Sequence, residues 1–203
     1  MKNLQFLLVL VGFINCRNAS TNSTIFDNKS AISTKNNNTS VKPALINNKE
    51  YISFDAVRIN GKLPLITKAN LLFKLLGQPD SIVVPNMDDV CVSFYDKPFK
   101  QAYIKKTAIE IYGDTAVVSS INFESNYHLE FTTKTIRLNH NTTLLGLQRL
   151  FPNTVKSKSE WDIVKLGKTV TVRLPTSKQL TDDSWLLFFK NGKLVRIDYY
   201  MPC

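Results

Sequence analysis

The sequence predicts an α+β fold in which two short helices alternate with antiparallel strands. Apolar residues recur at helical spacing in two stretches, and strand-like segments separated by turn signals follow each stretch. The order of these segments is the same in residues 53–123 and in residues 127–203. We therefore predict two approximate helix-plus-antiparallel-meander repeats that form one domain over residues 50–203.

The predicted helices start near Thr67 and near Thr142, whose hydroxyl groups suit helix N-caps. Four apolar residues on one face mark each helix: Ala69, Leu72, Leu75 and Leu76 in the first, and Leu144, Leu147, Leu150 and Phe151 in the second. Pro79 and Pro152 follow the helix ends, because proline lacks a backbone donor and restricts the residue before it.

Four strands are predicted after each helix. They cover residues 90–95, 101–104, 108–112 and 115–123 in the first half, and 162–166, 169–174, 184–189 and 193–200 in the second. Asn191-Gly192 is the strongest hairpin signal, since both residues readily adopt positive φ. The run from Trp185 to Phe189 is apolar on both faces, which predicts a strand that is covered on both sides or a strand with one binding face.

The amino-terminal sequence predicts export. Lys2 is followed by a short apolar run over residues 4–14, which is too short to span a bilayer and is typical of a signal peptide over residues 1–15. Residues 13–16 resemble the lipobox of bacterial lipoproteins, which implies that Cys16 carries the lipid anchor. The alternative is ordinary cleavage and release of a soluble secreted protein.

Residues 17–49 are rich in Asn, Ser, Thr and Lys and have few apolar residues. Such a composition cannot offset the entropy of ordering, so we predict a disordered linker from the lipidated N-terminus at residue 16 to residue 49. About thirty flexible residues would hold the domain roughly 30 Å from the membrane.

Cys91 and Cys203 remain as a pair if Cys16 is acylated, and an exported protein can keep a disulfide between them. That bridge would close a long loop and contribute about 4–5 kcal/mol at most. Two free thiols are the alternative. The net charge of +10 is spread without a dense basic run, which argues against a nucleic-acid partner and leaves a solvated basic face, an acidic partner protein or an anionic lipid surface.

No residue pattern predicts catalysis, a metal site or a cofactor. His128 and His140 lack neighbours at ligand spacing, and the acidic pairs Asp88-Asp89 and Asp182-Asp183 lie beside turns. Aromatic residues that could line either the core or an interface are Phe94, Tyr95, Phe99, Tyr103, Trp185, Tyr199 and Tyr200. From these we predict an interface at Trp185, Tyr199 and Tyr200.

The segments 76–80 and 189–197, together with the doubled helix-and-meander order, resemble the superfamily of the β-lactamase inhibitor protein and the SmpA/OmlA-type envelope lipoproteins. The strand-like segment before each helix departs from that pattern. The resemblance implies protein binding through a sheet surface without catalysis. We therefore expect a membrane-anchored envelope protein that faces the periplasm or the cell exterior and binds an unknown envelope protein. A periplasmic immunity or inhibitor lipoprotein against a toxin or hydrolase, and a lipid- or glycan-binding envelope protein, are the alternatives.

Overall fold

The computed structural model describes residues 50–203, which form an α+β fold made mostly of antiparallel strands. The predicted signal peptide, the anchor at Cys16 and the predicted linker lie outside the described residues. No helix within residues 50–203 is long and apolar enough to cross a membrane.

The elements fall into two consecutive groups along the chain, residues 54–122 and residues 131–200. The first half contains η1 (Phe54–Ala56), β1 (Arg58–Ile59), β2 (Leu63–Pro64), β3 (Ile66–Lys68), α1 (Ala69–Leu76), β4 (Ser81–Val83), η2 (Met87–Asp89), β5 (Lys100–Ile104), β6 (Thr107–Tyr112) and β7 (Thr115–Asn122). The second half contains β8 (Phe131–Thr132), β9 (Arg137–Leu138), α2 (Leu144–Leu150), α3 (Pro152–Lys156), β10 (Ser159–Ile163), β11 (Gly167–Pro175), β12 (Ser184–Lys190) and β13 (Lys193–Tyr200).

The main sheet joins the strands of both halves in the order β10-β11-β12-β13-β7-β6-β5-β4. The two meanders meet where β13 pairs antiparallel with β7, with Ile197 opposite Ile121. β3 pairs with the beginning of β7, and a small second sheet has the order β2-β1-β8-β9. The last strand of each half thus lies in the middle of the main sheet.

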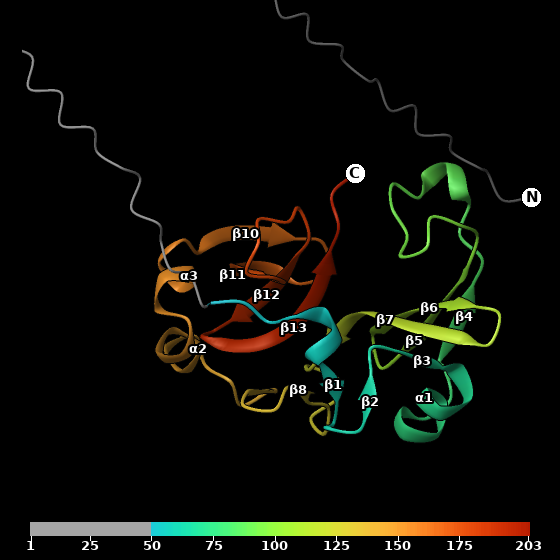
Figure 1. Cartoon of the computed structure of the whole chain (residues 1–203), viewed down its shortest axis with the longest axis horizontal. Helices are drawn as coiled ribbons and strands as arrows, with labels where there is room; N and C mark the ends of the chain where they lie inside the picture. Colours follow the sequence, from blue (N-terminus) through green and yellow to red (C-terminus); the bar gives the residue numbers. More distant parts are fainter. Residues whose placement is uncertain (1–49) are drawn as a thin grey trace, which may run out of the picture. The chain divides into compact units, whose positions relative to one another are not determined.

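One face of the main sheet carries the hydrophobic core. Ile109, Ile121 and Ile197 point toward this core from β6, β7 and β13 and are at most 2% exposed. Leu72 of α1 and Leu147 of α2 are fully buried in the same cluster. The two helices and the small sheet therefore lie on the core side of the main sheet (Figure 1).

Both helices begin beside a hairpin turn of the main sheet. The amide of Ala69 donates to the carbonyl of Asp114 at 2.8 Å, and the amide of Leu144 donates to the carbonyl of Gly192 at 3.0 Å. The helix starts near Thr67 and Thr142 were each predicted slightly early, because α1 is preceded by Lys68 and α2 is capped by the hydroxyl of Thr143. A sheet contact, rather than a side-chain cap, thus fixes the start of α1.

The predicted strands that rested on alternating apolar and polar residues and on turn signals are present in the structure. The predicted strands that correspond to β5, β6, β7, β11, β12 and β13 are confirmed. Asn191 and Gly192 have φ of 51° and 74°, as the predicted hairpin requires. The run from Trp185 to Phe189 is buried on both faces. The prediction for 162–166 was shifted, since β10 covers Ser159–Ile163, and neither β4 nor α3 was predicted.

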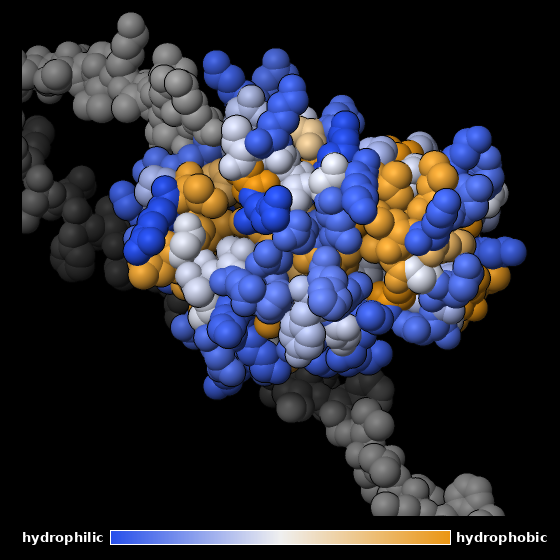
Figure 2. All heavy atoms as spheres, turned by 90° about the horizontal axis from the view of Figure 1, so that it is seen from below, coloured by the Kyte–Doolittle hydropathy of each residue, from blue (hydrophilic) through white to orange (hydrophobic). Residues whose placement is uncertain are grey.

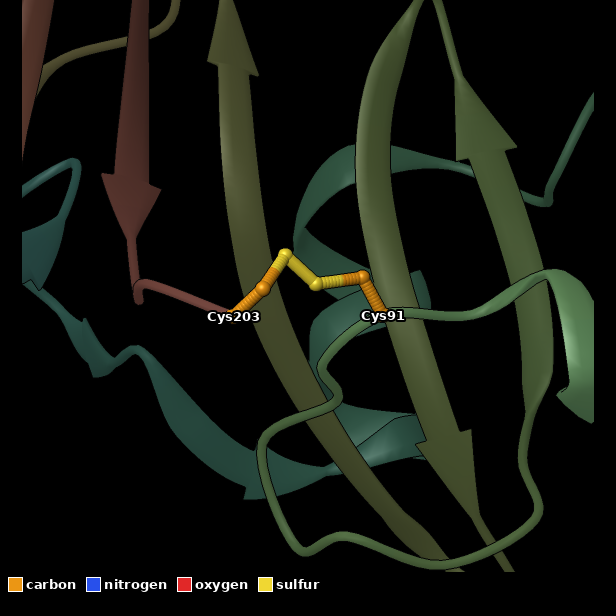
Figure 3. The surroundings of a disulfide bond; sticks show 2 residues. All are labelled: Cys91 and Cys203. Carbon is orange, nitrogen blue, oxygen red and sulfur yellow. A yellow bond between two sulfur atoms is a disulfide. The ribbon is translucent and has the colours of Figure 1, made fainter.

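Residues 90–95 do not form the predicted strand. They belong to a loop that bonds to side chains of β6 instead of to a neighbouring strand. The amide of Phe94, for example, donates to the carboxylate of Glu110 at 2.9 Å. Cys91 in this loop and Cys203 after β13 lie at disulfide distance, with their Cα atoms 5.5 Å apart. Figure 3 shows the two side chains directed toward each other. The loop is thus connected to the end of the second half.

Candidate functional site: the open face of the main sheet

The face of the main sheet that points away from the core is open at its centre. Along β6, β7 and β13, side chains that alternate with the core residues point to this face. A cleft of ≈ 730 Å³ lies over them. Its lining consists of Asp80, Tyr103, Lys106, Ala108, Ser120, Asn122, Glu124, Val164, Lys165, Leu166, Arg196 and Asp198.

The floor of the cleft holds an ordered polar group where the two halves join. The guanidinium of Arg196 pairs with the carboxylate of Asp198 at 3.0 Å, and the hydroxyl of Ser120 donates to the same carboxylate at 2.6 Å. Arg196 also lies over the ring of Phe188 at 4.4 Å. The side chains of Arg196 and Asp198 are 22% and 25% exposed, so a partner can still reach them. This arrangement presents a guanidinium group and a carboxyl group side by side in fixed positions.

The ionisation of Asp198 reflects two opposing effects. Burial raises the pKa of this carboxyl group, and the charge of Arg196 and the hydrogen bond from Ser120 act in the opposite direction without cancelling the rise. The Nε atom of Arg196 is buried and has no hydrogen-bond partner among the described residues. The guanidinium of Arg196 therefore makes its described polar contact with Asp198 through Nη2 and not through Nε.

The rim of the cleft is partly apolar. The turn between β10 and β11 folds over this face, and Leu166 packs there against Leu186, Phe188 and Val195. Val164 in the same turn is 83% exposed, and Tyr103 of β5 is 37% exposed. An aromatic ring and an aliphatic side chain thus flank the charged floor.

The open face continues to the end of the sheet where β11 and β13 finish on either side of the start of β12. Arg173 donates from Nε to the hydroxyl of Ser184 at 2.9 Å, and its guanidinium lies 5.1 Å from the ring centre of Tyr200. Beside it, the loop 176–183 borders an open pocket of ≈ 510 Å³. Burial alone would raise the pKa of Asp183, but hydrogen bonds from Thr176, Thr181 and Tyr199 lower it overall. Asp183 therefore fixes the loop as an ionised acceptor.

The predicted interface residues have different roles. The prediction that Trp185 is an interface residue was wrong, because Trp185 is only 2% exposed and its Nε1 donates to the carbonyl of Ile52 at 2.7 Å. Tyr199 is partly buried, and its hydroxyl donates to Asp183 at 2.9 Å. Tyr200 is 37% exposed and is the member of the set that lies at the surface. Its neighbour on the open face is Arg173, which the interface prediction did not include.

Most of the other candidate aromatic residues pack within the fold. The ring of Phe54 lies 5.3 Å from Phe94, 4.6 Å from Tyr199 and 5.8 Å from Trp185. Phe99 packs against Tyr112 at 5.6 Å. Tyr95 and Tyr103 are 41% and 37% exposed, and only Tyr103 lines the cleft.

The titratable residues singled out from the sequence do not converge. Within residues 50–203 no group of three or more His, Cys, Asp or Glu residues could hold a metal ion. His140 packs edge-on against Tyr127 at 5.2 Å, whereas Asp88 and Asp89 lie in η2. Asp183 accepts structural hydrogen bonds, as described above.

Sequence reasoning missed Ser120, Arg196 and Asp198. Arg196 and Asp198 alternate with apolar residues along β13, which marks one polar face of that strand, but Ser120 lies 78 residues away in the chain. Comparisons with family models, with curated proteins and with solved structures gave no match.

Proposed function

We propose that this protein is a non-catalytic, membrane-anchored envelope lipoprotein that binds another protein through the open face of its main sheet. The observation that carries the proposal is the cleft over β5, β6, β7 and β13. There a fixed Arg196-Asp198 pair lies between the exposed side chains of Tyr103 and Val164.

The composition of this face favours a protein partner. Tyrosine and arginine are the residue types that most often dominate binding energy at protein interfaces. Arg196 is already held by Asp198 and Phe188, so little side-chain entropy is lost when a partner binds. Tyr103, Arg196 and Asp198 lie on strands, which hold them more rigidly than loops would.

The anchor and the location are proposed from the sequence. The apolar leader over residues 1–15 and the lipobox-like ending at Cys16 support acylation, and residues 17–49 supply a tether. Two or three acyl chains give stable anchoring, whereas one chain does not. The proposed location is the periplasmic or outward side of the cell envelope.

We also propose that the two halves are structural repeats. Several features support this: a helix followed by a four-stranded meander in each half, the pairing of the two last strands, and the bond from each helix start to a hairpin turn. β3 pairs with the start of β7, and Thr143 forms a bridge with Lys193 at the start of β13. Such a duplication would account for the sheet face that runs across both halves.

An immunity or inhibitor lipoprotein would use the same face. In that case the charged pair and Tyr103 would contact a toxin or hydrolase rather than an assembly partner. The identity of the captured protein distinguishes these two forms of the proposal.

Site-specific photo-crosslinking in intact cells tests the proposal. A photoreactive phenylalanine analogue replaces Tyr103 in the full chain, and in a matched control it replaces Tyr51, since both tyrosines are 37% exposed. We expect a discrete protein adduct from position 103 that is absent at position 51. Adducts of equal intensity at both positions, or none at position 103, would contradict binding through this face.

A further inference from the structure

The outward face of α2 is apolar and basic. Leu147 and the following Phe151 point into the core. At 100° per residue Leu145 projects about 160° from Leu147, on the opposite side of the helix, and is 60% exposed. Leu150 projects about 60° from Leu147, on the flank of the helix, and is 50% exposed although the sequence placed it on the core face. At 100° per residue, Arg149 projects between these two leucines. No described residue covers this face, so its apolar area is available for contact.

The chain around α2 contains no acidic residue over a long stretch. Residues 131–159 include no Asp or Glu but carry five basic residues, namely Lys134, Arg137, Arg149, Lys156 and Lys158. The turn of β12 and β13 lies against the start of α2 through the bond from Leu144 to Gly192, and it adds Lys190 and Lys193. Of these residues, Arg149 lies in the last turn of α2 and Lys156 in the last turn of α3, whereas Arg137 pairs with Glu130 at 3.3 Å.

The two halves differ in this respect. Residues 50–123 contain eight basic and eight acidic residues, whereas residues 124–203 contain twelve basic and seven acidic residues. The excess charge of the domain therefore belongs to the half that contains α2.

The described chain also begins at this end of the domain. The carboxylate of Glu50 accepts hydrogen bonds from the amides of Asn153 and Thr154 at 3.0 Å and 2.7 Å, which fixes residue 50 at the start of α3. Because residues 17–49 directly precede Glu50 in the sequence, the proposed tether joins the domain next to α2 and α3. The anchor and the basic face are thus attached to the same end.

We propose that the outward face of α2, with the basic residues around it, docks on an anionic lipid surface. This inference rests on the proposed lipid anchor at Cys16. Leu145 and Leu150 enter the boundary between headgroups and acyl chains, and Arg149, Lys156 and Lys158 contact lipid phosphates. The tether keeps the domain close to the bilayer, which raises its local concentration there and makes weak docking effective.

The position of α2 leaves the protein-binding face free. α2 and α1 lie on the core side of the main sheet, whereas the cleft opens on the other face. Figure 2 views the molecule from below Figure 1 and shows hydrophobic surface at both ends, separated by a hydrophilic band. On α1, the exposed Leu71 and Lys74 offer a second, smaller contact of the same kind. Lipid and protein partners could then be bound at the same time.

Hydrogen exchange on vesicles tests this docking. The acylated full chain is incorporated into phosphatidylcholine vesicles or into vesicles that also contain phosphatidylglycerol, and exchange is followed for peptides covering residues 143–158. We expect exchange in these peptides to be about tenfold slower on the anionic vesicles, because basic groups near an anionic surface bind it favourably. The peptides covering β5 to β7 serve as an internal reference and should not change.

Three variants separate the contributions of charge and apolar contact. The R149E/K156E/K158E variant should lose the slowing on anionic vesicles, whereas the charge-matched K100E/K105E/K168E variant should keep it. The L145S/L150S variant should lose part of it without unfolding, since both leucines are exposed.

The outcomes distinguish this inference from the proposed anchor. Failure of the full chain to float with vesicles of either composition would reject the anchor. Flotation with equal exchange on neutral and anionic vesicles would overturn the docking alone. Slow exchange that appears only in native membranes, and not in protein-free vesicles, would show that a protein covers α2 and would also overturn the inference.

Discussion

The two faces of the main sheet have different roles, although the same strands form both of them. On the covered face, Ile109, Ile121 and Ile197 pack under α1 and α2 and are almost fully buried. On the open face, Ser120, Arg196 and Asp198 form a hydrogen-bonded group that remains partly accessible. One strand, β13, supplies residues to both faces because successive side chains alternate.

This difference assigns stability mainly to the covered face and binding to the open face. The covered face stabilises the fold through burial, which depends on area and packing. The open face contributes less burial but presents charges whose geometry is fixed by their neighbours. We therefore expect substitutions on the covered face to lower the free energy of unfolding, and substitutions at the rim of the open face to change binding instead.

The largest effect should come from Trp185 on the covered face. Replacing it with Ala removes a buried ring and its hydrogen bond to Ile52, and should lower the free energy of unfolding by about 3–5 kcal/mol. Urea denaturation followed by circular dichroism measures this change. The Tyr103→Ala variant on the open face is the control and should stay within about 0.5 kcal/mol of the wild type. Similar losses for both variants would remove the distinction between the faces.

The second-largest loss of stability should follow removal of the bridge between Cys91 and Cys203. Replacing both cysteines with Ser should lower the free energy of unfolding by about 2–4 kcal/mol, because the bridge closes a loop of 112 residues. Denaturation of the oxidised wild type, the reduced wild type and the double variant measures it. If the bridge forms, the reduced wild type should match the variant. A wild type that reduction leaves unchanged in stability would show that the two thiols are free.

The charged pair on the open face should have a smaller effect. The Asp198→Ala variant should lose about 1–2 kcal/mol, since it leaves the guanidinium of Arg196 and the hydroxyl of Ser120 without their acceptor. A double-mutant cycle with Arg196→Ala measures the coupling between the two side chains. If the two losses simply add, the pair is not coupled and the open face lacks the order assigned to it here.

The smallest effect should come from Glu50, which is near the start of α3. Glu50→Ala removes an acceptor for the first amides of that helix and should cost about 1 kcal/mol near neutral pH. Hydrogen bonds from Asn153 and Thr154 lower the pKa of Glu50 overall, although burial alone would raise it. Its stabilising effect is therefore present above its ordinary value of 4.5 and disappears as the pH falls through the lowered pKa.

Asp198 should show the opposite pH dependence to Glu50. Because its pKa is raised, the folded state binds the proton more tightly, so its contribution to stability falls as the pH rises through the folded pKa. The free energy of unfolding is measured between pH 3 and 7 for the wild type, Glu50→Gln and Asp198→Asn. The comparison shows whether the contribution of each carboxyl group to stability rises or falls with pH. A change in the same direction for both carboxyl groups would contradict the assigned environments.

The sequence predicted those parts of the fold that depend on local signals. β11 and β13 alternate apolar and polar residues, and Asn191-Gly192 fixes the last hairpin regardless of distant contacts. The loop containing Cys91 could not be predicted in the same way, because the amide of Phe94 is satisfied by Glu110 of another element. Its apolar composition resembles that of a strand, but its hydrogen bonds are to side chains.

The candidate site was less predictable for a related reason. Ser120 and Asp198 meet only because β7 pairs with β13, and no local pattern specifies that pairing. The prediction for Trp185 failed because composition alone does not distinguish a buried apolar strand from one with an exposed face. Its ring is covered by the segment around Ile52, which lies 133 residues earlier in the chain.

The most direct test of the open face as the binding surface is a comparison of affinities for the protein captured by crosslinking. Titration should show at least about tenfold weaker binding for Tyr103→Ala, as expected for an interface tyrosine, and unchanged binding for Leu71→Ala on α1. Unchanged binding for Tyr103→Ala together with a loss for Leu71→Ala would place the partner on the helical side and contradict the account.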